Sequence, residues 1–129
     1  MNYIGKRPLV LVVDDHQQVL RFIEINLKLH GFEVITTTSG VEALAIIDVE
    51  KPDIMLLDIV MPLIDGFEVL RRLRLFNELP VIAFSASISN CANAIKLGAN
   101  AFVSKPFNVN DLAGKIRAFL RGQWSESAG

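Results

Sequence analysis

The sequence predicts an α/β domain in which a five-stranded parallel sheet is doubly wound, with helices on both of its faces. Short runs of branched apolar residues alternate along the chain with stretches whose apolar residues recur at helical spacing, which is typical of β-α units in series. The first run, residues 9–13, is continuously apolar, as expected for a strand covered on both faces. The 129 residues are enough for one such domain and too few for two. We therefore expect a single domain with five helices and right-handed crossovers.

Five segments have the composition of strands. The second of them is more polar than the others and is expected to lie nearer an edge of the sheet. The segments are separated by stretches long enough to hold a helix, which parallel strands need as a crossover connection. The predicted strands are residues 9–13, 33–36, 53–57, 80–84 and 101–104.

The stretches between these strands carry the start and stop signals of helices. Val19, Ile23 and Leu27 recur at helical spacing before the stop residue Gly31. Later helices are expected to begin at caps, which are polar side chains that accept hydrogen bonds from the first free N–H groups. The remaining helices are predicted from a capping box at Ser39 and Glu42 through Val49, from the cap Asp65 with Val69, Leu70 and Leu73 on one face, over residues 88–97 before Gly98, and from the cap Asn108 with Leu112, Ile116, Phe119 and Leu120.

The composition favours a globular domain in a reducing compartment. The 13 basic and 14 acidic residues leave a net charge of -1, which gives no reason to expect nucleic-acid binding. The single cysteine cannot form an internal disulfide, and the polar residues 1–7 lack the pattern of a secretion signal. No apolar run approaches the roughly 20 residues that cross a bilayer. We expect a cytoplasmic protein without membrane contact, with an extension at 1–7, one domain at 8–121 and a tail or linker at 122–129.

Charged residues stand at the ends of three predicted strands. Asp14 and Asp15 follow the first strand, Asp58 follows the third, and Lys105 follows the fifth. The carboxyl ends of parallel strands share one edge of the sheet, and ligands of open α/β sheets bind at that edge. Three carboxylates and one ammonium there indicate a site for a divalent cation and a phosphoryl group. Taken singly, each aspartate could equally be a turn residue or a helix cap.

The adjacent acids Asp14 and Asp15 are harder to explain as caps. Like charges at one strand end repel each other, and they are tolerated if a cation lies between them and Asp58. Mg²⁺ suits such a site because it prefers hard oxygen ligands. A carboxylate held by a metal beside a lysine can act as a nucleophile, so Asp58 is the candidate phosphoacceptor and Lys105 would neutralise oxygens of the transferred group.

Other polar residues near these strand ends have more than one interpretation. Lys105 precedes Pro106, and an X-Pro bond at a strand end can be cis, which would direct the lysine toward the site. Ser85 ends the fourth strand, where its hydroxyl can bond a phosphoryl oxygen or cap a helix. His16 and His30 are expected to be solvated, because neither has a second ligand at metal-binding spacing.

The set of motifs resembles the response-regulator receiver domain of two-component signalling. The resemblance covers about residues 8 to 121. Each motif alone is weak, whereas the set in this order is specific. The resemblance implies a flavodoxin-like receiver fold with strand order 2-1-3-4-5, an order that the hydrophobic pattern alone does not give. The motifs are Asp14-Asp15, Asp58 followed by Met61-Pro62 and Asp65-Gly66, Ser85-Ala86, and Lys105-Pro106-Phe107.

By this resemblance, the chain is a phosphorelay switch that accepts a phosphoryl group on Asp58 from a histidine kinase or a histidine phosphotransfer protein. Asp15, Asp58 and the backbone carbonyl of Val60 would bind Mg²⁺ directly, and Asp14 would act through water. The domain would catalyse its own phosphorylation and dephosphorylation and would turn over no external metabolite.

The resemblance also assigns a contact and a switch. Ser85 and Lys105 would touch the phosphoryl group. Phe102 stands at the family's aromatic switch position, although the residue taken alone is typical of a plain core phenylalanine. Ser85 replaces the commoner threonine, which keeps the hydroxyl but frees its rotamer. An output domain or a separate effector protein is the further partner that the resemblance implies.

Two further groups of residues take roles from the family. Val60 and Ser87 occupy variable positions that tune hydrolysis of the phosphorylated form, and Val60 cannot orient a water. Residues 98–101 lack the paired acids typical of receivers that dimerise through charged faces of the fourth helix, fifth strand and fifth helix, which argues against such a dimer and leaves the oligomeric state open. The surface expected to dock the histidine phosphodonor comprises Gln18, Val19, Phe22 and Ile25, for which packing is the simpler alternative.

Three rival interpretations fit the sequence less well. A flavodoxin-like cofactor binder needs a small-residue phosphate loop after the first strand, where Asp14 and Asp15 would repel a phosphate. An aspartate-nucleophile phosphatase needs an Asp-x-Asp motif, and Val60 stands where its second acid would be. A degenerate receiver that only binds proteins would be expected to lose an acid or Lys105, and all are present.

Overall fold

Five parallel strands form one sheet in the computed structural model, which describes residues 6–122. The strand order is β2-β1-β3-β4-β5, so β3 lies at the centre and β2 and β5 are the outermost strands. This order and the parallel pairing confirm the predicted fold class. The strands are β1 Leu9–Val13, β2 Glu33–Thr37, β3 Ile54–Asp58, β4 Val81–Ser85 and β5 Ala101–Ser104. Residues 1–5 of the expected extension and 123–129 of the expected tail lie outside the described part.

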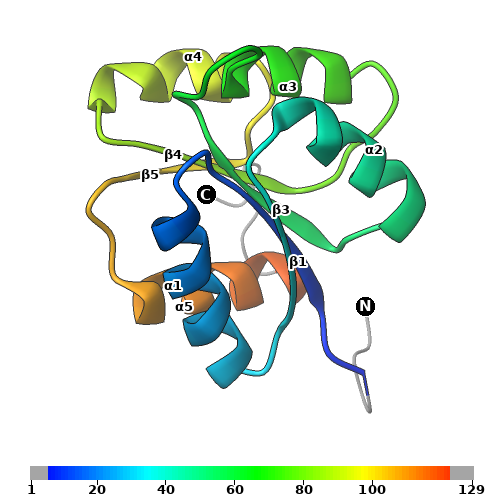
Figure 1. Cartoon of the computed structure of the whole chain (residues 1–129), viewed down its shortest axis with the longest axis vertical. Coiled ribbons are helices and arrows are strands. Elements are labelled where there is room, and N and C mark those ends of the chain that lie inside the picture. The colour runs from blue at the N-terminus through cyan, green and yellow to red at the C-terminus, as the bar shows by residue number, and fades with distance from the viewer. Residues whose placement is uncertain (1–5, 123–129) are drawn as a thin grey trace.

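Helices cover both faces of the sheet. The helices α2, α3 and α4 lie on one face, and α1 and α5 lie on the other (Figure 1). Alternate strand residues point to opposite faces, so Leu11 and Leu57 pack with the first group while Val10 and Leu56 pack with the second. The helices are α1 Gln17–Leu29, α2 Gly40–Glu50, α3 Gly66–Leu73, α4 Cys91–Lys96 and α5 Val109–Leu120. None of the described helices is both long and apolar enough to cross a lipid bilayer.

The predicted helix caps at Ser39, Asp65 and Asn108 are confirmed, because each side chain accepts a hydrogen bond from a backbone N–H of the first turn. The capping box at Ser39 is one-sided. The Glu42 carboxylate accepts from the Thr37 hydroxyl instead of the Ser39 N–H, and the Ser39 N–H donates to the Thr37 oxygen at 3.1 Å. Thr37 therefore ties the end of β2 to the start of α2.

The central strand β3 is shifted by one residue from its predicted position, and it ends on Asp58. Asp53 precedes the strand, and its carboxylate accepts a hydrogen bond from Leu9 N at 2.8 Å, which fastens the start of β1. Asp58 instead pairs with Phe84 in the ladder between β3 and β4. The backbone of the candidate phosphoacceptor is thus fixed by strand pairing.

The helix predicted over residues 88–97 is wrong in its first turn. Residues Ile88–Asn90 form a separate 3₁₀ turn, and α4 is only 6 residues long. The short polar side chains of this turn bond to nearby groups rather than leaving the backbone to propagate a regular helix. The hydroxyls of Ser87 and Ser89 lie 2.7 Å apart, and the Asn90 amide donates to the Ser85 oxygen.

Gly66 allows helix α3 to start directly against the end of β3. Its N–H donates to the Ile59 carbonyl at 2.8 Å. A Cβ atom at Gly66 would lie 2.5 Å from the Asp58 carbonyl oxygen and 2.6 Å from the Ile59 Cα atom. Both neighbours are backbone atoms, so they cannot rotate away as a side chain could. The glycine of the Asp65-Gly66 motif is therefore needed for the close packing of α3 against the end of β3, next to the candidate site.

We predict that Gly66→Ala lowers the free energy of unfolding by about 1–3 kcal/mol, the usual cost of forcing a backbone shift in a packed region. Gly114→Ala is the matched control, because nothing lies within 4 Å of a Cβ atom at Gly114 in α5. This control should gain roughly 0.5–1 kcal/mol from its better helix propensity. Urea denaturation of the three proteins measures both changes, and equal stability of the two variants would contradict the prediction.

Candidate functional site

Two buried carboxylates form the centre of the site. Asp14 follows β1 and is 0% exposed, and Asp58 ends β3 and is 2% exposed. Strands β1 and β3 are neighbours in the sheet, so their ends bring these residues to the same edge. The Asp14 N–H donates to the Thr37 carbonyl at 3.2 Å, which continues the pairing of β1 with β2. The sheet therefore positions both acids through their backbones.

Lys105 supplies the positive charge that the two acids need. Its Nζ atom lies 3.3 Å from Asp14 Oδ2 and 3.7 Å from Asp58 Oδ2. The ammonium also lies 5.0 Å from the centre of the Phe84 ring, which provides a further attraction for a cation. The Lys105-Pro106 peptide bond is cis. The structure thus brings together the acids and the lysine that the sequence singled out.

The charge balance at this edge makes ionisation of Asp58 harder than that of an ordinary aspartate. Burial and the neighbouring negative charge of Asp14 raise the pKa of Asp58 to about 6, against the opposing effect of Lys105 and of a hydrogen bond from Val60 N–H. One ammonium does not offset two acids that have left water. A bound cation would relieve this excess of negative charge.

Asp15 lies beside these acids and offers a further oxygen to a cation. Its Oδ1 atom is buried and accepts no hydrogen bond from the described residues, although His16 Nδ1 lies 3.3 Å away. Ligand atoms of Asp14, Asp15, His16 and Asp58 all lie within 4.8 Å of one another. Carboxylate oxygens at this spacing suit a hard divalent cation such as Mg²⁺, which takes few protein ligands and keeps several waters. The residues present therefore fit the metal that the sequence implied.

His16 is exposed to solvent, as expected, but its ring also contacts the acidic pair. Its ring is 64% exposed, yet Nδ1 lies 3.0 Å from Asp14 Oδ1 and 3.3 Å from Asp15 Oδ1. The hydrogen bond to Asp14, together with the charge of Asp15, raises the pKa of the imidazole. Motifs of metal-ligand spacing concern residues that are several positions apart. They therefore do not reveal a contact between His16 and the acids directly before it. His30 is also paired, with Nδ1 lying 2.8 Å from the Asn26 carbonyl oxygen.

Ser85 ends β4 at the same edge and is 1% exposed. Its Oγ atom accepts hydrogen bonds from Ser87 N–H at 3.1 Å and from the Asn90 side chain at 3.0 Å. The hydroxyl is thus directed into its own β4–α4 loop. No sequence pattern singled out Asn90, because its contact with Ser85 depends on the unexpected 3₁₀ turn.

The remaining predicted residues surround this centre. Phe102 is half-buried on β5 and packs against the apolar cluster of α2, α3 and α4. Val60 is 62% exposed in the loop after β3, and Ser87 is exposed in the loop after β4. Of the expected docking surface on α1, Gln18, Phe22 and Ile25 are exposed, whereas Val19 is half-buried.

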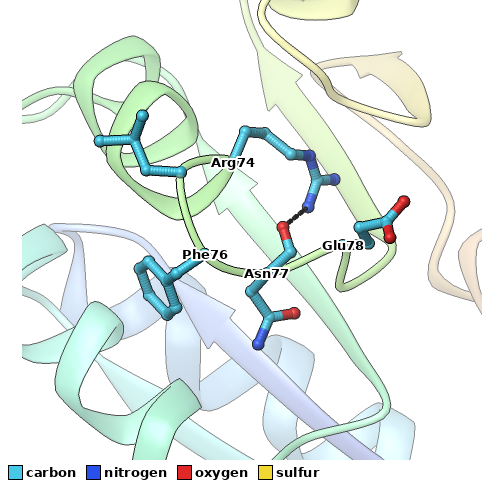
Figure 2. Close-up of a pocket in the computed structure, with 5 residues that line it drawn as sticks. Arg74, Phe76, Asn77 and Glu78 are labelled. Atoms are coloured by element: carbon cyan, nitrogen blue, oxygen red, sulfur yellow. Dashed lines mark hydrogen bonds between the residues drawn. The ribbon is translucent and has the colours of Figure 1, made fainter.

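A separate hollow of about 710 Å³ lies at the connection between α3 and β4 (Figure 2). It is bounded by Leu75, Phe76 and the side chain of Arg74, which donates to the carbonyls of Asn77 and Gly98. This connection leads to the amino end of β4, so the hollow lies at the edge of the sheet opposite the acids. The candidate site is therefore the acidic edge rather than this hollow.

A comparison with protein families gives a match to the response regulator receiver domain over residues 10–117. A curated relative, the probable transcriptional regulator ycf27 of Cyanophora paradoxa, is 38% identical over 114 residues, which are 87% of this chain and 48% of that protein. The chain thus spans about half the length of this relative.

Solved receiver domains are similar to the chain in both fold and sequence. The receiver domain of the Francisella response regulator 1452 superposes with a TM-score of 0.85 at 30% identity, covering 90% of this chain and 98% of that one. A CheY-like receiver domain protein from Methanospirillum hungatei gives a TM-score of 0.84 at 31% identity, covering 96% and 100%. The chain belongs to the response regulator receiver domain family, whose members are signalling proteins rather than metabolic enzymes.

The raised pKa of Asp58 predicts how stability depends on pH in the metal-free protein. A carboxyl whose folded-state pKa is raised stabilises the fold fully below its unfolded pKa, and this contribution is lost as the pH rises through about 6. Asp58→Asn avoids that loss. We expect its free-energy gain over the parent to be larger at pH 7.5 than at pH 4 by roughly 2–3 kcal/mol.

Urea melts in the presence of a chelator at the two pH values provide the measurement. Asp48→Asn is the matched control, because Asp48 is exposed on α2. If Asp58→Asn and Asp48→Asn shifted stability equally at both pH values, burial of the Asp58 charge would not be what destabilises the neutral-pH fold.

Proposed function

We propose that the domain is a phosphorelay switch that accepts a phosphoryl group from a histidine phosphodonor onto Asp58. The observation that carries this proposal is the meeting of three acids and Lys105 at one sheet edge in a member of the receiver family. The functional unit is residues 8–121, and its chemistry acts on itself and on no external metabolite. The expected location is the cytoplasm, where histidine phosphodonors and Mg²⁺ are available.

Asp58 is the nucleophile of the proposed transfer. A carboxylate oxygen attacks the phosphorus, the P–N bond to the donor imidazole breaks, and that imidazole keeps the electron pair and then takes a proton from water. The raised pKa of Asp58 still leaves it mostly ionised at neutral pH. The Val60 N–H donates a hydrogen bond of 3.3 Å to Asp58 Oδ1, which helps to orient the carboxylate.

Charge neutralisation is the main catalytic effect available at this edge. Mg²⁺, when bound, supplies a charge that offsets the phosphoryl oxygens. Asp15, Asp58 and the Val60 carbonyl would hold it directly, and Asp14 would act through water. Lys105 exchanges its contact with Asp58 for one with the transferred group, which its flexible stem allows.

The switch that we propose follows from the new charge. The Ser85 hydroxyl turns toward the phosphoryl group, and Phe102 turns inward, so that the face formed by α4, β5 and α5 changes shape. We further propose that an output domain or effector protein binds this face and that the phosphodonor docks on α1. Phe22 and Ile25 support this docking surface because their apolar side chains are exposed. The same surface includes Gln18 and Val19.

We predict that incubation with phosphoramidate and Mg²⁺ adds one phosphoryl group to the protein by mass. Asp58→Asn should gain none, and removal of Mg²⁺ with a chelator should abolish the gain in the parent. Asp48→Asn, with an exposed aspartate changed in the same way, should behave as the parent. Phosphorylation of Asp58→Asn at the parental level would show that the acceptor is elsewhere.

We also predict a slow decay of the phosphorylated form. Hydrolysis needs a water aligned with the phosphorus, and Val60 is an exposed apolar group beside that approach. Ser87 offers little help, because its hydroxyl pairs with Ser89. Val60→Asn should speed phosphate release, and each tenfold change corresponds to about 1.4 kcal/mol of barrier.

Phosphate release after removal of the donor measures the lifetime. Val49→Asn is the control, since Val49 is an exposed valine in the last turn of α2, at the other edge of the sheet. Fast decay of the parent that Val60→Asn leaves unchanged would show that water access at this position does not limit the lifetime.

A further inference from the structure

The hydroxyl of Ser85 is held in place by the segment that follows it. The structure gives its Oγ atom two hydrogen-bond partners, Ser87 N–H and the Asn90 side-chain amide. Both donors come from the loop and the 3₁₀ turn between β4 and α4. Neither Asp58 nor Lys105 is bonded to this hydroxyl in the described part of the chain.

Asn90 stands at the N-cap position of α4, where asparagine side chains usually accept a hydrogen bond from the first turn. Here the side chain makes no such bond, and the Asn90 backbone is itself helical at φ −79° and ψ −10°. The carboxamide instead reaches back over 5 residues to Ser85. The start of α4 therefore gives up its cap while Asn90 holds the serine.

We propose that Asn90 is a positioning residue that holds the Ser85 hydroxyl in the resting state and links its release to a rearrangement of α4. The inference rests on the proposed function, in which Ser85 turns toward a phosphoryl group on Asp58. When the hydroxyl turns, Asn90 loses its partner and no longer fastens the 3₁₀ turn to the site, so the start of α4 is free to rearrange.

The helix that Asn90 controls is weakly anchored. It has 6 residues, of which only Ala94 is buried. The preceding residues 86–89 are exposed, so little apolar packing opposes a change of this turn. A single hydrogen bond is therefore a substantial share of what fixes the start of α4.

Loss of this bond should shift the resting equilibrium toward the form with Ser85 released. A net hydrogen bond of ordinary strength corresponds to about a two- to tenfold change in that equilibrium. A ligand that binds only the released form then gains apparent affinity by the same factor.

Beryllium fluoride with Mg²⁺, a non-reactive phosphoryl mimic, provides the first test. Titrations followed by NMR should show that Asn90→Ala binds the mimic about two- to tenfold more tightly than the parent. Asn93→Ala is the matched control, because Asn93 is exposed on the same helix, and it should bind with parental affinity. Unchanged or weaker binding by Asn90→Ala would overturn the proposal.

Amide hydrogen exchange in the protein without mimic or donor provides the second test, which does not depend on phosphoryl chemistry. Asn90→Ala should speed exchange over residues 87–94, and the same substitution in a Ser85→Ala background should add nothing, because the partner is already gone. Equal effects in the two backgrounds would overturn the proposal. Failure of the parent to bind the mimic would instead count against the proposed function, and the exchange data would still decide whether Asn90 holds Ser85.

Discussion

The site depends on the burial of two like charges that a single lysine holds at one sheet edge. Asp14 and Asp58 are withdrawn from water, and Lys105 contacts a separate oxygen of each. Burying carboxylates costs free energy that their attraction to one ammonium does not fully return. The raised pKa of Asp58 expresses this deficit. The same deficit favours the binding of a cation at this edge. Under the proposed function, the edge where charge burial costs free energy is also the edge where the phosphoryl group is accepted.

Backbone geometry makes this crowding possible. The ends of β1 and β3 are fixed by pairing with their neighbours, so Asp14 and Asp58 cannot separate without breaking the sheet. Gly66 lets α3 begin against the β3 end, where any side chain would meet the Asp58 carbonyl. Strand pairing and the close approach of α3 therefore hold the backbones that carry the acids.

Much of this arrangement could be predicted from the sequence because its signals are local. Continuous apolar runs gave the strands, caps gave three helix starts, and charges after the runs gave the acidic edge. The contacts that escaped depend on side-chain direction. The His16 ring contacts Asp14 because the chain turns back after β1. The Asn90 side chain reaches Ser85 because residues 88–90 form a 3₁₀ turn. Helical spacing in residues 88–97 predicted a regular helix, since it takes no account of competition from serine and asparagine side chains.

The unequal anchoring of the helices explains why a small change at the edge can have a directed effect. Helix α1 buries Leu20, Ile23 and Leu27, and α5 buries four residues, so both are fixed to the sheet. Helix α4 buries one residue and is tied to the site through Asn90 and Ser85. A free-energy change of the size of one hydrogen bond is too small to move α1 or α5, yet it is comparable to what holds the start of α4. Under the proposed function, the chemistry at Asp58 is therefore transmitted through the least anchored helix, and the weakness of α4 is what makes the domain a switch.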